Sequence, residues 1–277
     1  MKTVTLPSGK RVSALGLGTW HLGENRATRA EEIATLRLGL DLGSTLIDSA
    51  EMYGEGRSEE LVAEAIEGRR DEVFLVSKVS PNNASRKGAV AACERSLARL
   101  RTDCIDLYLL HWRGNVPLAE TIEAFVALQQ AGKIKHYGVS NLDPADMQEL
   151  WSVPGGPSVA TNQLLYNLAR RGIEWDLLPW LRERRIPIMA YSPIEQAKLT
   201  LNPKLVDFAR RHSMTPAQAG LAWLLVHEDV IVIPKTGRRD RLKENVGALD
   251  HRLTQAQLAE LDRLFPPPRG PRPLEML

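Results

Sequence analysis

Four side chains that can exchange protons or carry charge lie near the ends of three consecutive apolar runs. Asp48 ends the second apolar run of the chain, and Tyr53 follows it by five residues. Lys78 ends the third run, and His111 ends the fourth. A carboxylate, a phenol, an ammonium and an imidazole can together deliver a proton to an oxygen that gains negative charge.

The expected roles follow from ordinary acid–base chemistry. An unperturbed tyrosine has a pKa of about 10, so we expect the Lys78 ammonium to lower the pKa of Tyr53. Asp48 would hold Lys78 in place by an ion pair, and His111 would be a second donor. The alternative is structural: an Asp48–Lys78 ion pair across one end of the fold, a loop tyrosine and a core histidine. The joint position of the four at strand ends favours a reactive site.

Short apolar runs alternate with helix-like stretches, which predicts the elements that position these residues. Helical spacing is clearest in Ser58–Ile66 and Arg86–Leu100, and Asp143-Pro144 is a typical helix start. Eight alternating units predict a (β/α)8 TIM barrel formed by residues 1–277 as a single domain with a tail at 266–277; an open doubly wound sheet is the alternative. The predicted strands are Ala14–Gly18, Thr45–Ile47, Val73–Val76, Ile105–Leu110, Tyr137–Val139, Val159–Thr161, Ile188–Ala190 and Val230–Ile233.

Some segments fall outside the eightfold count. Lys2–Val12, with Pro7-Ser8-Gly9 at its centre, predicts a β-hairpin that caps one end of the barrel. We also expect two extra helices, one of them running from Thr215 to His227 between units seven and eight.

Composition limits the classes of partner. The chain has 36 Lys and Arg against 34 Asp and Glu, a net charge of +2, which gives no indication of a nucleic-acid or membrane partner. Cys93 and Cys104 are the only cysteines and form no CxxC motif, which fits a reducing compartment. His227-Glu228 lacks a second histidine, so no metal site is predicted. With neither a signal peptide nor a long apolar run, we expect a cytoplasmic protein. We also expect a monomer, although no pattern determines the oligomeric state.

Several motifs, in order along the chain, resemble those of the aldo-keto reductases. The resemblance runs from the N-terminal hairpin to about Leu264, and the overall pattern is most similar to bacterial methylglyoxal and general aldehyde reductases. The motifs are Gly16-Leu17-Gly18-Thr19-Trp20, Leu46-Ile47-Asp48-Ser49-Ala50-Glu51-Met52-Tyr53-Gly54, Val76-Ser77-Lys78, Asp106-Leu107-Tyr108-Leu109-Leu110-His111-Trp112, Gly138-Val139-Ser140-Asn141, Asn162-Gln163, Tyr191-Ser192-Pro193, Ile233-Pro234-Lys235-Thr236-Gly237, Arg241 and Glu244-Asn245.

This resemblance implies a catalytic tetrad of Asp48, Tyr53, Lys78 and His111 and the cofactor NADPH, bound without a Rossmann fold. It implies that Ser140, Asn141 and Gln163 bind the nicotinamide carboxamide, that Tyr191 stacks on the ring, that Lys235, Thr236 and Arg241 hold the 2′-phosphate, and that Glu244 and Asn245 meet the adenine. The other implied cofactor contacts are Gly18, Thr19, Trp20, Asp48, Ser192, Pro193, Ile194, Gln196, Ile233, Pro234 and Gly237. Trp20, Met52 and Trp112 would form the substrate wall beside Tyr53 and His111.

Two of these implications also have a physical basis in the residues. An Arg fork and a Lys suit a phosphate monoester, which favours NADPH over NADH, whereas Arg238 and Arg239 are assigned to a solvated helix face. Gly16-Leu17-Gly18 is not a dinucleotide fingerprint, because His21 stands where that motif needs Gly or Ala. These glycines are expected to let the backbone pack closely beneath the pocket.

Short loops after His111 and after Phe265 suggest an open pocket for a small carbonyl substrate: an aldehyde, a ketone or a dicarbonyl such as methylglyoxal. The loop at 193–199 lacks the glycine expected of a segment that clasps the cofactor. Two alternatives remain at this point. One is a barrel aldolase in which Lys78 forms a Schiff base, and the other is a cofactor-sensing regulatory subunit.

Overall fold

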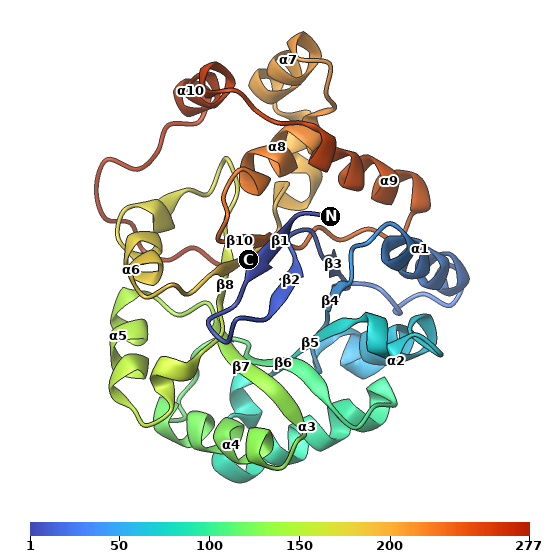
Figure 1. Ribbon diagram of the computed structural model, residues 1–277, viewed down its shortest axis with the longest axis vertical. Coiled ribbons are helices and arrows are strands. Elements are labelled where there is room, and N and C mark those ends of the chain that lie inside the picture. The colour runs from blue at the N-terminus through green and yellow to red at the C-terminus, as the bar shows by residue number, and fades with distance from the viewer.

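Eight parallel strands lie at the centre of the computed structural model, which describes all 277 residues (Figure 1). Each strand pairs with the next one along the chain, so the spatial order is the sequence order. The strands are β3 (Leu17–Gly18), β4 (Leu46–Asp48), β5 (Phe74–Val79), β6 (Ile105–Leu110), β7 (Ile134–Ser140), β8 (Asn162–Leu165), β9 (Ile188–Tyr191) and β10 (Val230–Val232).

Backbone hydrogen bonds between the first and last strands close the barrel. Gly16 N donates to Val232 O at 2.8 Å, and Gly18 N donates to Pro234 O at 3.0 Å. A Cβ on Gly16 would lie 2.7 Å from Leu46 Cδ2, and one on Gly18 would lie 3.0 Å from Ile233 O. The close packing expected of these glycines is therefore confirmed, and closure confirms the (β/α)8 barrel rather than an open sheet.

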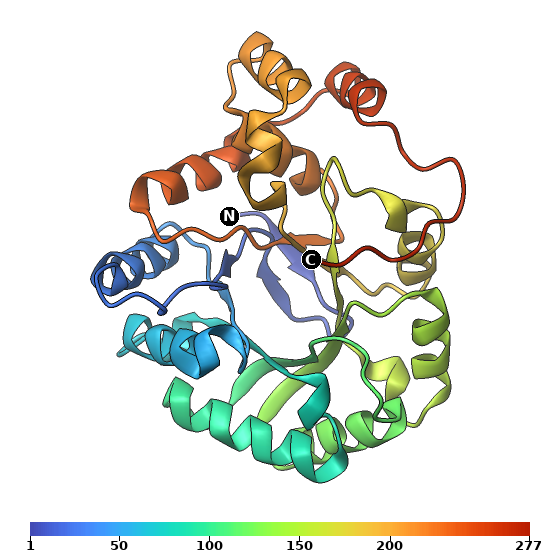
Figure 2. The same cartoon turned by 180° about the vertical axis from the view of Figure 1, so that it is seen from behind.

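Helices surround the barrel in the order in which they follow the strands (Figures 1 and 2). Those of the ring are α1 (Arg29–Asp41), α2 (Arg57–Ala65), α3 (Arg86–Leu100), α4 (Leu118–Gln130), α5 (Pro144–Ser152), α6 (Leu177–Glu183), α8 (Pro216–Leu225) and α9 (Arg239–Gly247). Capping boxes at Asp143 and Thr215 begin α5 and α8, since each side chain accepts the backbone N–H three residues on. Helices α7 (Pro203–Arg211) and α10 (Gln255–Leu264) lie outside the ring.

The helix at Thr215–His227 was expected to be an extra helix outside the eightfold repeat. That prediction is wrong, because this helix, α8, is one of the eight helices of the ring. Helix α8 packs on β10 and α9, and almost all of its side chains are buried. A helix that is apolar on every face is buried on every face. The added helix is α7, which packs on the outer side of α8.

One predicted strand is displaced along the chain. Val159–Thr161 makes backbone bonds to β7, but the strand itself is β8, which begins with the polar Asn162 and Gln163. Both side chains are buried, where Asn162 donates to Leu142 O and Gln163 donates to Asp48. Polar residues inside a strand hid it, because apolar runs are the usual signal of a buried strand.

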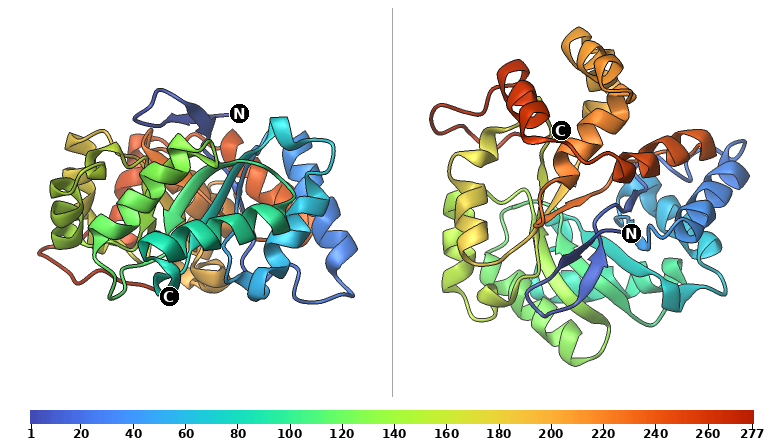
Figure 3. Two further views of the ribbon diagram at one scale, coloured as in Figure 1. Left: turned by 90° about the horizontal axis from the view of Figure 1, so that it is seen from below. Right: turned by 45° about the horizontal axis from the view of Figure 1, so that its top comes forward.

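The predicted N-terminal hairpin is present as β1 (Thr3–Thr5) paired antiparallel with β2 (Arg11–Ser13). It lies at one end of the barrel, and the C-terminus of the chain lies at the other (Figure 3). A contiguous core of 73 buried residues extends from Val4 to Phe265. None of the helices has the length and apolar character needed to span a membrane.

Candidate active site

A pocket of about 670 Å³ opens at the carboxyl ends of the strands, where (β/α)8 enzymes place their active sites. Every residue that the sequence assigned to cofactor or substrate lines this pocket except Pro234, whose carbonyl instead accepts a bond from Gly18. Lys78 is fully buried beneath the pocket floor. The pocket lining also includes His21, Ala197, Ala217, Arg238, Met276 and Leu277, which the sequence did not indicate.

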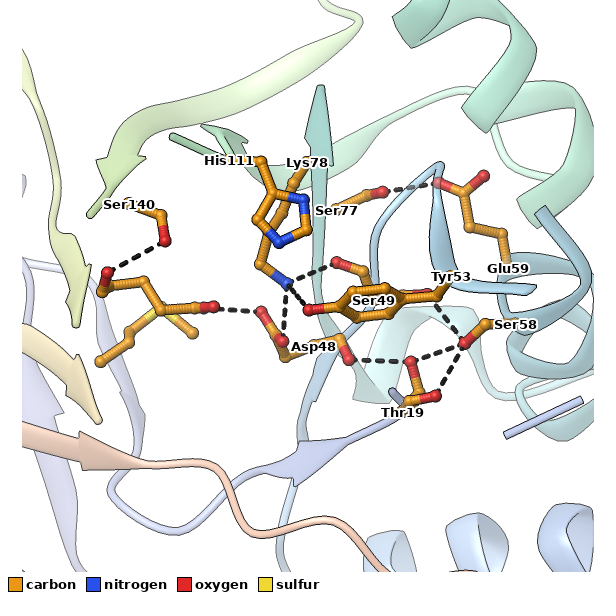
Figure 4. Close-up of polar contacts among 12 residues, drawn as sticks. Thr19, Asp48, Ser49, Tyr53, Ser58, Glu59, Ser77, Lys78, His111 and Ser140 are labelled. Atoms are coloured by element: carbon orange, nitrogen blue, oxygen red, sulfur yellow. Dashed lines mark hydrogen bonds and ion pairs between the residues drawn. The ribbon is translucent and has the colours of Figure 1, made fainter. Parts of the chain in front are cut away.

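The four proton-exchanging side chains come together at the floor of this pocket (Figure 4). Lys78 Nζ donates to Asp48 Oδ2 at 2.8 Å, to Ser49 O at 2.8 Å and to the Tyr53 hydroxyl at 3.2 Å. The rings of Tyr53 and His111 lie edge to face, with centroids 5.6 Å apart. One phenol therefore has a buried ammonium on one side and an imidazole on the other.

Burial and neighbouring charges together shift the pKa values of these groups. Burial alone would lower the pKa of Lys78, but the Asp48 carboxylate and the Tyr53 oxygen outweigh it, and the pKa is raised. Burial, with a further contribution from the Asp48 charge, raises the pKa of Tyr53 although the Lys78 ammonium acts to lower it. The expectation of a lowered tyrosine pKa is therefore wrong, because desolvation of the phenolate together with the Asp48 charge exceeds the attraction of one cation. Burial, followed by the Lys78 charge, lowers the pKa of His111 to about 2.

A second layer of hydroxyls supports Asp48 from behind. Thr19 Oγ1 donates to Asp48 O at 2.9 Å, and Ser58 Oγ donates to Thr19 Oγ1 at 2.8 Å (Figure 4). Ser58 also contacts Ser49 Oγ at 3.2 Å. The sequence did not single out Ser49 and Ser58 as supporting groups; their position in and just after the Asp48–Tyr53 segment was the available signal.

Amide and hydroxyl groups line the opposite wall. Ser140 pairs with Gln163 across β7 and β8, and Gln163 Nε2 donates to Asp48 Oδ1 at 2.8 Å. Asn141 Nδ2 donates to Ser140 Oγ at 3.1 Å, and Tyr191 donates to Asn141 Oδ1 at 3.0 Å. The Gln163 side-chain carbonyl accepts no hydrogen bond within the chain, which leaves one acceptor free for a ligand.

Cations at the far end of the pocket differ in whether they have an acidic partner. Arg239 pairs with Glu31, away from the pocket, as expected of a solvated face. Arg238 pairs with Asp240 at 2.7 Å, although it also lines the pocket edge, which the sequence did not predict. Lys235 and Arg241 line the pocket and make no ion pair. Two unpaired cations beside the N-terminus of α9 form a favourable environment for an anion.

Apolar side chains form the remaining wall. Trp20 and Met52 are 38% and 46% exposed, and Trp112 lies against His111 with ring centroids 4.9 Å apart. Met276 and Leu277, near the end of the chain, also line the pocket, at 47% and 53% exposure. Such a surface suits an apolar ligand and provides few polar contacts.

Comparison with known proteins places the chain in a family. The model of the Aldo/keto reductase family matches residues 14–265. Methylglyoxal reductase YeaE of Escherichia coli is 47% identical, over 100% of this chain and 99% of its own, and the glyoxal reductase of Bacillus subtilis is 32% identical over 99% and 97%. An aldo/keto reductase from Klebsiella pneumoniae, crystallised with NADP and acetate, superposes with a TM-score of 0.97 at 49% identity, over 100% of this chain and 99% of that one. Because the family model covers most of the chain and these relatives match it over nearly their full length, the chain belongs to the aldo/keto reductase family of oxidoreductases.

Proposed function

We propose that this enzyme uses NADPH to reduce small aldehydes, ketones and dicarbonyls such as methylglyoxal to alcohols. The observation that carries the proposal is the Tyr53 phenol, hydrogen-bonded to the buried Lys78–Asp48 pair at the floor of a pocket with two unpaired cations at its far end. Relatives named methylglyoxal reductase and glyoxal reductase, and a neighbour crystallised with NADP, support the cofactor and the substrate class.

The residues present fit NADPH in both charge and hydrogen-bonding capacity. Ser140, Asn141 and Gln163 would hold the carboxamide. The free Gln163 side-chain carbonyl would accept its N–H, and the Ser140 and Asn141 donors, which now bond to groups of the chain, would turn to its oxygen. The Tyr191 ring would lie against the nicotinamide. Lys235 and Arg241 would hold the 2′-phosphate, since they alone among the cations of this rim lack a carboxylate partner.

The bound nicotinamide would supply a hydride to the substrate carbonyl carbon. Tyr53 then gives its hydroxyl proton to the carbonyl oxygen; its raised pKa keeps it neutral, and so able to donate, across the physiological pH range. Lys78 stabilises the phenolate left behind, and Asp48 holds Lys78 in position. His111, uncharged because its pKa is about 2, donates an N–H to the same oxygen.

The Schiff-base alternative is not favoured by the geometry of Lys78. Its ammonium donates three hydrogen bonds, lies fully beneath the pocket floor, and has a raised pKa. A nucleophilic lysine needs the neutral amine and access to the substrate.

Tyr53→Phe tests the proposal. Loss of the general acid should lower kcat, measured by NADPH absorbance, by a factor of about 10² to 10⁴. The Kd for NADPH, measured by fluorescence titration, should stay unchanged. Tyr137→Phe is the matched control: its buried phenol donates only to Gly155 O and does not line the pocket. Full turnover by Tyr53→Phe would refute the assignment of the proton donor. NADPH binding without turnover of any carbonyl by the unmodified enzyme would favour the regulatory alternative.

A further inference from the structure

The C-terminal tail, residues 265–277, crosses the barrel from the outer helix α10 to the pocket mouth. Figure 2 shows this segment passing beside α6 and ending over the centre of the barrel. Arg272 packs against Gly172, and Leu274 packs against the core. Met276 and Leu277 then line the pocket, with the Leu277 backbone beside the Tyr191 hydroxyl. The last residues of the tail are therefore part of the pocket wall.

The loop after β9, residues 192–201, contributes to the same pocket. Ile194, Gln196 and Ala197 line it. Glu195, Gln196 and Ala197 have φ angles of 52°, 52° and 70°, and none of the three is a glycine. A run of left-handed residues persists only where surrounding contacts hold it in place. This loop therefore needs an anchor.

Glu195 supplies that anchor through its buried carboxylate. Its Oε1 accepts from Arg170 Nε and Nη2 at 2.9 and 2.8 Å, and its Oε2 accepts from Asn167 Nδ2 at 2.8 Å. Asn167 Nδ2 also donates to Ser192 O at 2.9 Å. The strained loop is thus held at two points by the segment that follows β8.

The same arginine also reaches the tail. Arg170 Nη1 donates to Glu275 Oε1 at 2.5 Å, next to the pocket residues Met276 and Leu277. Arg171, its neighbour in sequence, instead holds the start of the tail through Asp262 and the carbonyl of Phe265. We call Glu195, Arg170 and Glu275 the Arg170 bridge.

We propose that Arg170 is a positioning residue that couples the cofactor loop to the substrate wall. The inference rests on the proposed function, because it takes the β9 loop as the cofactor side and the tail as the substrate side. One planar guanidinium directs separate N–H groups at two carboxylates, so movement of either segment disturbs the other. A lysine presents no such fork and is expected to hold only one of the two.

The burial of the two carboxylates predicts unequal effects. The Glu195 side chain is 8% exposed and that of Glu275 is 43% exposed. Removing Arg170 leaves a buried carboxylate with a single amide donor, so the cofactor side should change most. Glu275 belongs to a half-exposed pair, which contributes little, so its loss should have a smaller effect.

The test uses Arg170→Gln, Arg170→Lys, Glu275→Gln and the double variant Arg170→Gln/Glu275→Gln in the full chain. NADPH affinity and dissociation rate are followed by fluorescence, and KM and kcat are measured with one carbonyl substrate. Arg170→Gln should raise the NADPH Kd roughly tenfold and the substrate KM about two- to fivefold, with little change in kcat. Glu275→Gln should raise only the KM, and the double variant should show no larger KM than Arg170→Gln.

Arg182→Gln is the matched control, since it breaks a pair with Asp229, 43% and 30% exposed, that does not line the pocket. Thermal unfolding separates a general loss of stability from an effect on the site. The bridge is refuted if Arg170→Gln keeps wild-type Kd and KM, if Glu275→Gln moves both constants equally, or if the two substitutions add in KM. If Arg170→Gln does not fold, the NADPH Kd and the substrate KM are compared between Arg170→Lys and Glu275→Gln instead. If the unmodified enzyme neither binds nor oxidises NADPH, the proposed function itself is refuted.

Discussion

Replacing Asp48 by asparagine would test the buried ion pair that the proposed mechanism requires. Lys78 and Asp48 side chains are 0% and 4% exposed and lie 2.8 Å apart. Asparagine keeps the size of the carboxylate but removes its charge, so Lys78 remains buried without a compensating anion. Breaking one partner of such a pair costs about 3–5 kcal/mol. That loss is a large part of the roughly 5–15 kcal/mol that stabilises a typical domain.

The stability of the wild type and that of Asp48→Asn should change with pH in opposite directions. In the wild type the folded-state pKa of Lys78 is raised above its ordinary 10.5, so its stabilising contribution is present below that pH and is lost as pH rises through the folded pKa. In Asp48→Asn, burial acts without the opposing carboxylate, and the folded-state pKa of Lys78 falls below the unfolded value. The unfolded chain then binds more protons, so the stability of this variant should rise with pH up to about 10.4.

Urea unfolding followed by circular dichroism at several pH values measures both effects, and it does not depend on activity. Lys78→Met and the double variant Asp48→Asn/Lys78→Met complete a double-mutant cycle. The double variant should recover most of the lost stability, because neither buried charge remains. A loss below about 1 kcal/mol in Asp48→Asn, the range of an exposed pair, or additive losses in the double variant, would refute the reasoning.

Two further predictions concern the ends of the pocket. Arg241→Ala should raise the NADPH Kd roughly tenfold, the effect of one lost charge-assisted contact. The same titration should show unchanged NADH binding. Arg239→Ala is the control and should change neither affinity, because Arg239 is paired with Glu31. Because the pKa of His111 is about 2 and that of Tyr53 is raised, kcat/KM for reduction should be flat between roughly pH 6 and 9. His111→Gln, a neutral donor, should retain far more activity than His111→Ala, and an ionisation near pH 6.5 that disappears in both variants would contradict a neutral imidazole.

Local sequence patterns predicted most of the strands and helices. The predictions that failed share one cause, which is that contacts between distant residues decide those elements. The apolar runs predicted the number and order of the strands, and the capping residues Asp143 and Thr215 marked helix starts. The strand β8 was displaced because its polar Asn162 and Gln163 are satisfied by partners distant in sequence. The role of the Thr215 helix was misjudged because two helices follow β9, and only packing decides which one covers β10.

The features of the candidate site likewise fall into those that the sequence predicts and those that depend on folding. The order of residues along the chain sets which side chains stand at the strand ends, because parallel strands of a barrel present their carboxyl ends at one face. The direction in which the pKa of Tyr53 shifts depends on the folded packing, since desolvation involves everything around the phenol and not its one cation alone. Only the tertiary structure brought Met276 and Leu277 into the pocket and joined Glu195 to Glu275 through Arg170. Those contacts connect residues up to 105 positions apart, and no local pattern carries information about which distant segments meet.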